Sequence, residues 1–144
     1  MAIALDTSVV VAALLSWHEE HDWARSTLED LLTSEEEILL PMRVVVEAYS
    51  VMTRLPSPHR LAPRDAWQLL DESFKSSSRL IGLTARQLWQ LLESLAEHCV
   101  AGGAAYDAEI IECAARGAAR AIVTLNRQQF ERLAPDELEV LGPR

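Results

Sequence analysis

The chain opens with Met1-Ala2-Ile3-Ala4-Leu5-Asp6-Thr7-Ser8-Val9-Val10, in which a short apolar run ends at an acid and a second apolar run follows. Residues 3–5 are typical of a buried strand and residues 9–15 of a buried helix. In an open parallel sheet, ligands bind beyond the carboxyl ends of the strands. Asp6 is therefore expected at that edge, either as a site residue or as the cap of the helix that follows.

Short strands and longer helical segments alternate to the end of the chain. Strands are expected at residues 3–5, 38–40, 79–83, 121–124 and 138–141, and helices at 9–15, 22–32, 42–55, 64–75, 85–100, 106–116 and 127–133. Strands separated by helices are typical of an α/β fold, here a three-layer α/β/α domain with a mainly parallel sheet of about five strands. The length predicts one domain, residues 1–144.

Two interruptions divide the helical segments. Three prolines between Leu55 and Arg64 remove backbone donors and restrict the residues before them, so a protruding loop is expected there. Its His59, Arg60 and Arg64 could contact a nucleic-acid backbone, although an ordinary solvated loop is the favoured interpretation. Residues 101–104, with two glycines, are expected to form a tight turn that lets the next helix begin near Tyr106.

The net charge of −9 is unevenly distributed along the chain. Residues 43–86 hold seven basic and four acidic side chains, a local charge of +3, whereas the remainder carries −12. So acidic a remainder repels nucleic acid. Any contact with a nucleic acid is therefore expected from residues 43–86, and it should be weak and sensitive to salt.

The cysteines and the apolar segments favour a cytoplasmic protein. Cys99 and Cys113 lack the paired spacing of a zinc site, so two reduced thiols and no disulfide are expected. The N-terminus has no basic region, and the apolar run 9–15 is too short to span a bilayer. The sequence therefore predicts no contact with a membrane.

Two more acids lie within apolar helical stretches. Glu47 is in the run 44–49 and Asp107 is in the run 106–111. Because ionised carboxylates are almost never buried without a partner, Asp6, Glu47 and Asp107 are expected to converge on a cation. A surface position for Glu47 and a favourable helix-dipole position for Asp107 are the alternatives.

The helix at residues 106–116 separates its acids by face. Asp107 shares the apolar face, whereas Glu109, Glu112 and Arg116 mark the solvated side. Glu112 is expected to pair with Arg116 across one helical turn. The contrast distinguishes a candidate site acid from surface acids.

Oxygen ligands without histidine or cysteine select Mg²⁺, with Mn²⁺ as a second candidate. Carboxylates close together repel one another, and a cation removes that repulsion. A carboxylate-held Mg²⁺ suits phosphate esters because it polarises the phosphoryl oxygen and stabilises the leaving oxygen. The sequence thus predicts a metal bound by Asp6, Glu47 and Asp107.

Four segments together resemble a PIN-domain ribonuclease of the VapC toxin type. They are Leu5-Asp6-Thr7-Ser8-Val9-Val10, the isolated Glu47 followed by Ala48-Tyr49, Tyr106-Asp107-Ala108, and Ile122-Val123-Thr124-Leu125-Asn126 before Phe130. The resemblance covers essentially the whole chain, and the order and spacing of the segments are more specific than any one of them.

The resemblance implies a PIN-like fold and metal-dependent endonucleolytic cleavage of RNA, with a 3′-hydroxyl and a 5′-phosphate as products. It also implies a homodimer and inhibition by a small cognate antitoxin. Asp6, Glu47 and Asp107 would form the acidic cluster, which Ser8 and Thr124 would support through their hydroxyl groups. An antitoxin side chain bearing Arg or Lys would suit the same acidic pocket.

One position departs from the family pattern. The family usually carries a fourth acid after the threonine that ends the fourth strand, or a few residues later, where this chain has Asn126 and Gln129. Neither amide carries charge, but Asn126 can still offer a carbonyl to a metal or orient a water molecule. One firmly bound ion and a weaker or absent second ion are expected.

Two other functions compete with the toxin reading. A catalytically weakened PIN domain could act mainly as the partner of a DNA-binding antitoxin, and the two amides are its best support. A phosphorylated receiver domain is also a small parallel α/β fold with an acidic Mg²⁺ site. It requires adjacent acids after the first strand and an aspartate after the middle one, which this chain lacks.

The histidines and tryptophans give weaker signals. His18 and His21 have a spacing of three residues, unlike the pair of a zinc protease, so surface roles are expected. Trp67 and Trp89 lie among leucines at helical spacing, which is more typical of core or interface residues than of base-stacking platforms. Trp17 and Trp23, near the start of the second helix, are better candidates for a contact with an antitoxin or a second copy of the chain.

Overall fold

The computed structural model describes residues 1–143 and contains one five-stranded sheet with seven helices. The strands are β1 (Ala2–Leu5), β2 (Glu37–Pro41), β3 (Ser78–Ile81), β4 (Ala119–Val123) and β5 (Glu139–Leu141), and the helices are α1 (Thr7–Leu14), α2 (His21–Thr33), α3 (Met42–Arg54), α4 (Pro63–Phe74), α5 (Ala85–Glu97), α6 (Ala104–Arg116) and α7 (Arg127–Leu133).

The sheet is parallel throughout, with the order β3-β2-β1-β4-β5. The chain builds outward from β1 through β2 to β3, then crosses to the other side of β1 to add β4 and β5. The strand order therefore reverses between β1 and β4, and ligands bind at such a point in open parallel sheets. The predicted α/β class and all five predicted strands are confirmed.

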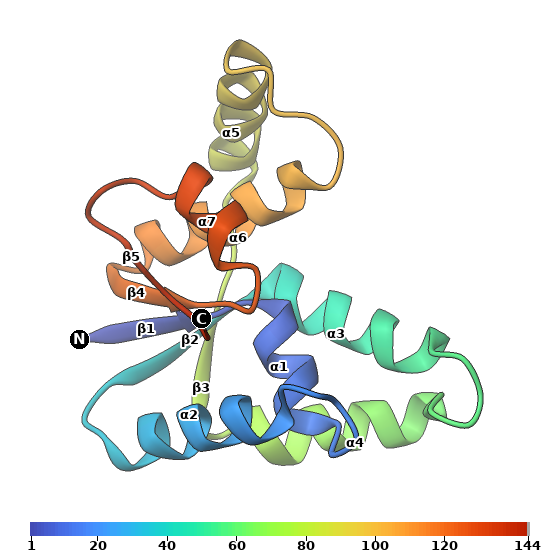
Figure 1. The fold of residues 1–144 in the computed structure, drawn as a ribbon. Helices are drawn as coiled ribbons and strands as arrows, with labels where there is room; N and C mark the ends of the chain where they lie inside the picture. The colour runs from blue at the N-terminus through green and yellow to red at the C-terminus, as the bar shows by residue number, and fades with distance from the viewer. Residues whose placement is uncertain (144) are drawn as a thin grey trace.

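Helices cover the sheet on both sides. In the view of Figure 1, α1, α2 and α4 lie below the strands and α5, α6 and α7 lie above them. The helices α3 and α4 form a hairpin that extends beyond the sheet, and its tip is the proline-containing loop predicted from the sequence (Figure 1). None of the described helices is both long and apolar enough to cross a membrane.

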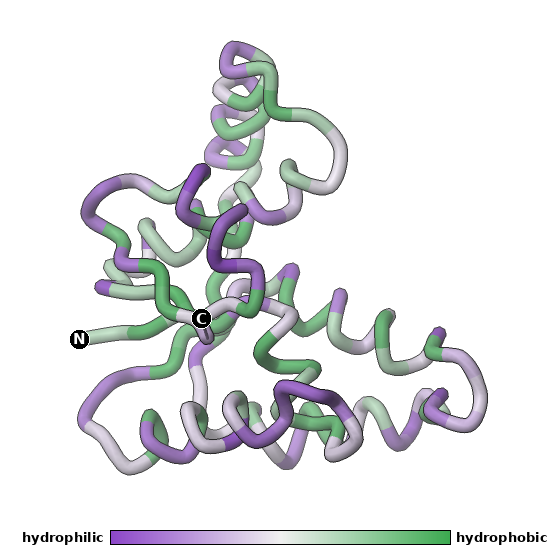
Figure 2. The backbone as a smooth tube through the Cα atoms, viewed as in Figure 1, coloured by the Kyte–Doolittle hydropathy of each residue, from purple (hydrophilic) through white to green (hydrophobic). Residues whose placement is uncertain are grey.

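The core is continuous from one helical layer through the sheet to the other. All four residues of β1 are buried, as are the last four of β2, so the central strands read as unbroken apolar runs. Figure 2 shows apolar residues along these strands and more polar residues on the outer turns of the helices. Phe74 and Phe130 are the largest fully buried side chains.

Several boundaries differ from the predicted ones because local capping decides them. Asp6 caps α1 through the backbone N–H of Thr7, so this helix begins two residues earlier than expected. The turn before α6 contains Gly102 in the left-handed region, at φ 66°, and α6 begins at Ala104. Asp107 still lies in the first turn of α6, as predicted.

Two tryptophans lie outside the core. Trp67 on α4 is 53% exposed and Trp89 on α5 is 73% exposed. Their helical spacing with leucines had favoured a core or an interface, and within the single chain the core alternative is wrong. Helix α5 contacts the rest of the fold mainly through α6, which leaves its other faces uncovered (Figure 1).

Gly142 offers a test of the packing beneath the strand ends. A Cβ atom at this position would clash with the backbone carbonyl oxygen of Thr124, and backbone cannot rotate away as a side chain can. We expect Gly142→Ala to lower the free energy of unfolding by about 1–3 kcal/mol in urea titrations.

Gly103→Ala is the matched control for this substitution. Gly103 has φ −61° and no atom lies within 4 Å of a Cβ built there, so alanine should fit without strain. We expect Gly103→Ala to leave the stability unchanged or to raise it by about 0.4–1 kcal/mol. A Gly142→Ala variant as stable as the wild type would contradict the proposed clash.

Candidate active site

Asp6 anchors the candidate site at the carboxyl end of β1. Its backbone N–H donates to the carbonyl of Val123 at 2.9 Å, which carries the β1–β4 pairing to the strand ends. The side chain is 3% exposed and accepts three hydrogen bonds. The Thr7 N–H donates to Oδ1 at 2.7 Å, and the hydroxyls of Ser8 and Thr124 donate to Oδ2 at 2.7 and 2.8 Å.

The two supporting hydroxyls are themselves held by the chain after β4. The Leu125 N–H donates to Ser8 Oγ at 3.0 Å, and the Asn126 N–H donates to Thr124 Oγ1 at 2.9 Å. Both hydroxyl hydrogens therefore point to Asp6. Asp6 thus caps α1, and this role is compatible with the sequence interpretation of Asp6 as a site residue.

Glu47 and Asp107 lie on the same cavity as Asp6. This cavity, of about 260 Å³, is lined by Asp6, Thr7, Ser8, Val11, His18, Glu47, Val51, Asp107 and Asn126. The three acids come from the end of β1, from α3 and from α6, which are far apart in sequence. Asn126, which stands where the PIN-domain family pattern usually has a fourth acid, also lines the cavity but is exposed.

The carboxylates destabilise one another's charged forms. Burial raises the pKa of Asp6, although its hydrogen bonds with Ser8, Thr124 and Thr7 oppose the shift. Burial and then the charge of Asp6 raise the pKa of Asp107 to about 6. The pKa of Glu47 is raised by the same two causes, against the opposing charge of Arg43.

The donor atoms of the cavity fit a hard divalent cation. Glu47 Oε1 is buried and has no hydrogen-bond partner, which is costly for a carboxylate unless a cation or water completes it. Asp6 retains acceptor capacity on Oδ1, since a carboxylate oxygen accepts about two hydrogen bonds and only one is made there. Asp6, Glu47 and Asp107 could therefore hold such an ion.

The three acids do not form a closed ligand cage. Within residues 1–143, no three His, Cys, Asp or Glu side chains lie close enough together to form a complete metal site. Mg²⁺ commonly keeps several water molecules and binds through only one or two carboxylates. An open arrangement of this kind therefore suits Mg²⁺ better than a metal that needs four protein ligands.

An ion pair joins α3 to α6, and both of its charges act on Glu47. Arg43 donates to Glu109 Oε1 from Nε at 3.2 Å and from Nη2 at 2.9 Å, and its guanidinium lies 4.8 Å from the centre of the Tyr106 ring. The prediction that Glu109 belongs to the solvated side is wrong, because α3 packs against α6 and covers it. The predicted pair of Glu112 and Arg116 is present at 2.8 Å.

His18 is the cavity residue that the sequence did not reveal. It was assigned to the surface, yet it lines the cavity with the three acids. It lies in the loop between α1 and α2, and the packing of α1 against α2 and α3 places that loop. No spacing in the sequence predicts that His18 lies near the acids, because His18 and each of the three acids belong to different secondary-structure elements or loops.

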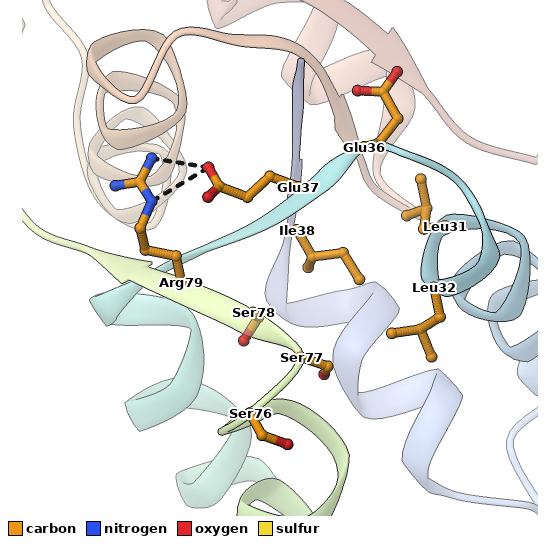
Figure 3. A pocket seen from close by; sticks show the side chains of 9 residues that line it. All are labelled: Leu31, Leu32, Glu36, Glu37, Ile38, Ser76, Ser77, Ser78 and Arg79. Atoms are coloured by element: carbon orange, nitrogen blue, oxygen red, sulfur yellow. Dashed lines mark hydrogen bonds and ion pairs between the residues drawn. The ribbon is translucent and has the colours of Figure 1, made fainter.

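A cavity at the opposite edge of the sheet has a different character. It has a volume of about 360 Å³ and lies beside the first residues of β2 and β3 (Figure 3). Arg79 there donates to Glu37 from Nε at 3.2 Å and from Nη2 at 3.0 Å, so its principal charges neutralise each other. Of these two cavities, only the one at the carboxyl edge of the sheet brings together carboxylates that have no ion-pair partner within residues 1–143.

Comparison with known proteins gives a consistent result. The family model described as the PIN domain matches residues 3–135. The chain is 39% identical over 129 residues to ribonuclease VapC40 of Mycobacterium tuberculosis, which is 90% of each protein. It is 36% identical over 118 residues to ribonuclease VapC27 of the same species, covering 78% of this chain and 77% of the relative.

The fold is also similar to that of a solved complex. The crystal structure of VapBC2 from Rickettsia felis bound to a DNA fragment from their promoter contains a chain with a TM-score of 0.70 and 21% identity, and the match covers 100% of both chains. At that identity, the likeness concerns the fold.

The raised pKa of Asp107 predicts a stability cost in the metal-free protein. Its pKa is 3.8 for the free group and about 6 in the folded protein, so the folded state holds this proton more tightly. Stability is therefore lost as the pH rises from about 4 to about 6 and stays lost above that range. We expect Asp107→Asn to raise the stability by about 1 kcal/mol at pH 7.5 in EDTA, after allowance for solvent screening of this half-buried group.

Thermal unfolding with and without Mg²⁺ checks this expectation. The wild type should gain stability on addition of Mg²⁺ at pH 7.5, whereas Asp107→Asn should gain little because it has lost a ligand. Glu112→Gln removes a carboxylate from the solvated face of the same helix and should retain the response to Mg²⁺. A metal-free Asp107→Asn variant that is less stable than the wild type would refute the electrostatic cost.

Proposed function

Since the chain belongs to the PIN-domain family, we propose that it is a metal-dependent endoribonuclease that acts as the toxin of a toxin–antitoxin pair. The observation that carries this proposal is the meeting of Asp6, Glu47 and Asp107 in one cavity at the carboxyl edge of the sheet. The relatives VapC40 and VapC27 are named ribonucleases, which supports RNA as the substrate.

Each acid has a distinct place in the proposed reaction. Asp6 is fixed by three donors, so it would hold Mg²⁺, or Mn²⁺, in a set position relative to β1 and β4. Glu47 and Asp107 face the same cavity and would complete the protein's share of the ligands or orient a water molecule. The bound ion would supply positive charge against the phosphate and lower the pKa of bound water.

Other residues near the cavity affect the pKa of the acids and the charge that is available to a ligand. Burial raises the pKa of Asp6, and the hydroxyls of Ser8 and Thr124 oppose that rise because both donate to its charged form. Asn126 lines the cavity without adding charge, so a second cation would bind less tightly there. Arg43 is engaged by Glu109, which limits its freedom to meet a phosphate.

We propose two protein partners. A small antitoxin would place an Arg or Lys side chain in the acidic cavity, where it would compensate the carboxylates and exclude the metal. The Rickettsia felis structure is described as VapBC2, which supports an antitoxin as partner. A second copy of the chain would cover the exposed apolar side chains of α5, among them Leu88, Trp89 and Leu92.

A catalytically weakened domain that serves mainly as a protein partner is the second candidate. It is favoured by the uncharged Asn126 at the position where the family usually has an acid. A site with three carboxylates in one cavity favours the nuclease, because one carboxylate-bound Mg²⁺ suffices to polarise a phosphate ester.

Cleavage of RNA by the purified, antitoxin-free protein tests the proposed function. We expect a total-RNA pool to be cut with Mg²⁺ or Mn²⁺ and to remain intact in EDTA. Asp6→Asn and Asp107→Asn should each lower the rate by about 100-fold or more, since each removes a ligand of the ion that stabilises the transition state.

Glu112→Gln is the control for this experiment, because Glu112 pairs with Arg116 away from the acidic cavity and should be dispensable. A wild type that is folded but inert with both metals would reject the nuclease and favour the partner-binding candidate. Cleavage that is unaffected by either aspartate substitution would point to a contaminating nuclease.

The proposed homodimer predicts a change in size on substitution of α5. Trp89→Glu places a charge on the most exposed tryptophan of an uncovered helix and should convert a dimer to a monomer in light scattering. Glu93→Gln on the same helix should leave the dimer intact. A wild type that is already monomeric at 100 times the working concentration would remove the homodimer from the proposal.

A further inference from the structure

His18 lies in the acidic cavity in a defined protonation arrangement. The backbone N–H of Glu20 donates to His18 Nδ1 at 3.0 Å. A backbone N–H can only donate, so Nδ1 carries a lone pair toward it, and the neutral ring must hold its proton on Nε2. Nε2 makes no hydrogen bond within residues 1–143 and is therefore a free donor.

This arrangement decides what His18 can bind. A nitrogen that carries a hydrogen cannot ligate a metal ion, and Nδ1 is engaged by Glu20. The ring therefore fits an anionic oxygen acceptor rather than a cation. The acids lining the same cavity would hold the cation, so one ligand with both features, a phosphodiester beside a metal, fits both groups.

The loop that carries His18 is held before any ligand binds. The His18 N–H donates to the Leu15 carbonyl and the His18 carbonyl accepts from the His21 N–H, both at 3.0 Å. The neighbouring Trp17 stacks on His59 of the loop between α3 and α4, with ring centres 4.1 Å apart. Little conformational entropy is then lost when the ring meets a ligand.

We propose that His18 contacts the substrate, with its Nε2–H donating a hydrogen bond to a non-bridging oxygen of the RNA phosphodiester in the acidic cavity. This inference rests on the proposed ribonuclease function. It gives the cavity a hydrogen-bond donor beside the carboxylates, at a site whose lining residues, among those that the structure describes, include no arginine or lysine. Arg43, whose charge acts on Glu47, is engaged by Glu109.

Two substitutions separate the donor from the structural role of the ring. His18→Asn keeps an acceptor near the position of Nδ1 for the Glu20 N–H but has no donor near Nε2. His18→Gln reaches the position of Nε2 with an amide donor. We expect His18→Asn to lower kcat/KM for RNA about 10- to 100-fold and His18→Gln to remain within about threefold of the wild type, as for loss of a hydrogen bond to a charged group.

Measurement of RNA binding, together with thermal unfolding, separates a direct contact of His18 with RNA from an effect of the substitution on the stability of the loop. In the Asp107→Asn background, where cleavage should be about 100-fold slower or more, fluorescence anisotropy should show weaker binding of a single-stranded RNA by about 10-fold when His18→Asn is added. Thermal unfolding of His18→Asn should match the wild type. Equal activity and equal binding for His18→Asn, or an equal loss for the Asn and Gln variants, would overturn the inference.

Failure of the proposed function would look different. If the wild type cuts no RNA with Mg²⁺ or Mn²⁺, the nuclease proposal fails, and binding alone decides on His18. RNA binding by the wild type that His18→Asn weakens would then support the contact. No RNA binding, or binding that is the same in both proteins, would overturn the contact as well.

Discussion

The burial of one negative charge, on Asp6, governs the arrangement of this domain. Asp6 lies where β1 and β4 end beside each other and where the order of the strands reverses. Removing a carboxylate from water is costly unless donors replace the water, and Thr7, Ser8 and Thr124 provide them. Those donors can meet Asp6 only if α1 begins at Thr7 and β4 ends at Val123, directly before Thr124, so the burial of Asp6 fixes the carboxyl ends of both central strands.

The other acids add negative charge to a place that already holds one. The pKa of Glu47 and that of Asp107 are both raised, and Arg43 is committed to Glu109. The fold therefore leaves negative charge at the carboxyl edge of the sheet that no positive charge in the described part of the chain compensates. At the opposite edge, Glu37 and Arg79 neutralise each other. Such an imbalance is typical of functional sites, because a fold without a ligand to accommodate gains nothing from it.

The sequence predicted what depends on local pattern. Buried strands such as residues 38–40 appear as apolar runs, and Glu47 and Asp107 stand out because each interrupts an apolar helix face. The sequence did not predict the strand order, nor that His18 lines the cavity, nor that Arg43 pairs with Glu109 across 66 positions. These features arise from the packing of α1 and α3 against other elements. The periodicity of apolar residues, 2 in strands and 3.6 in helices, carries no information about that packing.

The raised pKa values of Glu47 and Asp107 have a consequence for how this protein can be handled and how it can evolve. Replacement of either acid relieves repulsion in the folded chain, so a variant that the proposed function expects to be inactive would gain stability from the same change. In a host that is harmed by an active nuclease, growth and protein yield would both select such replacements. Well-expressed clones therefore have to be sequenced at these two codons before their inactivity is attributed to the natural protein.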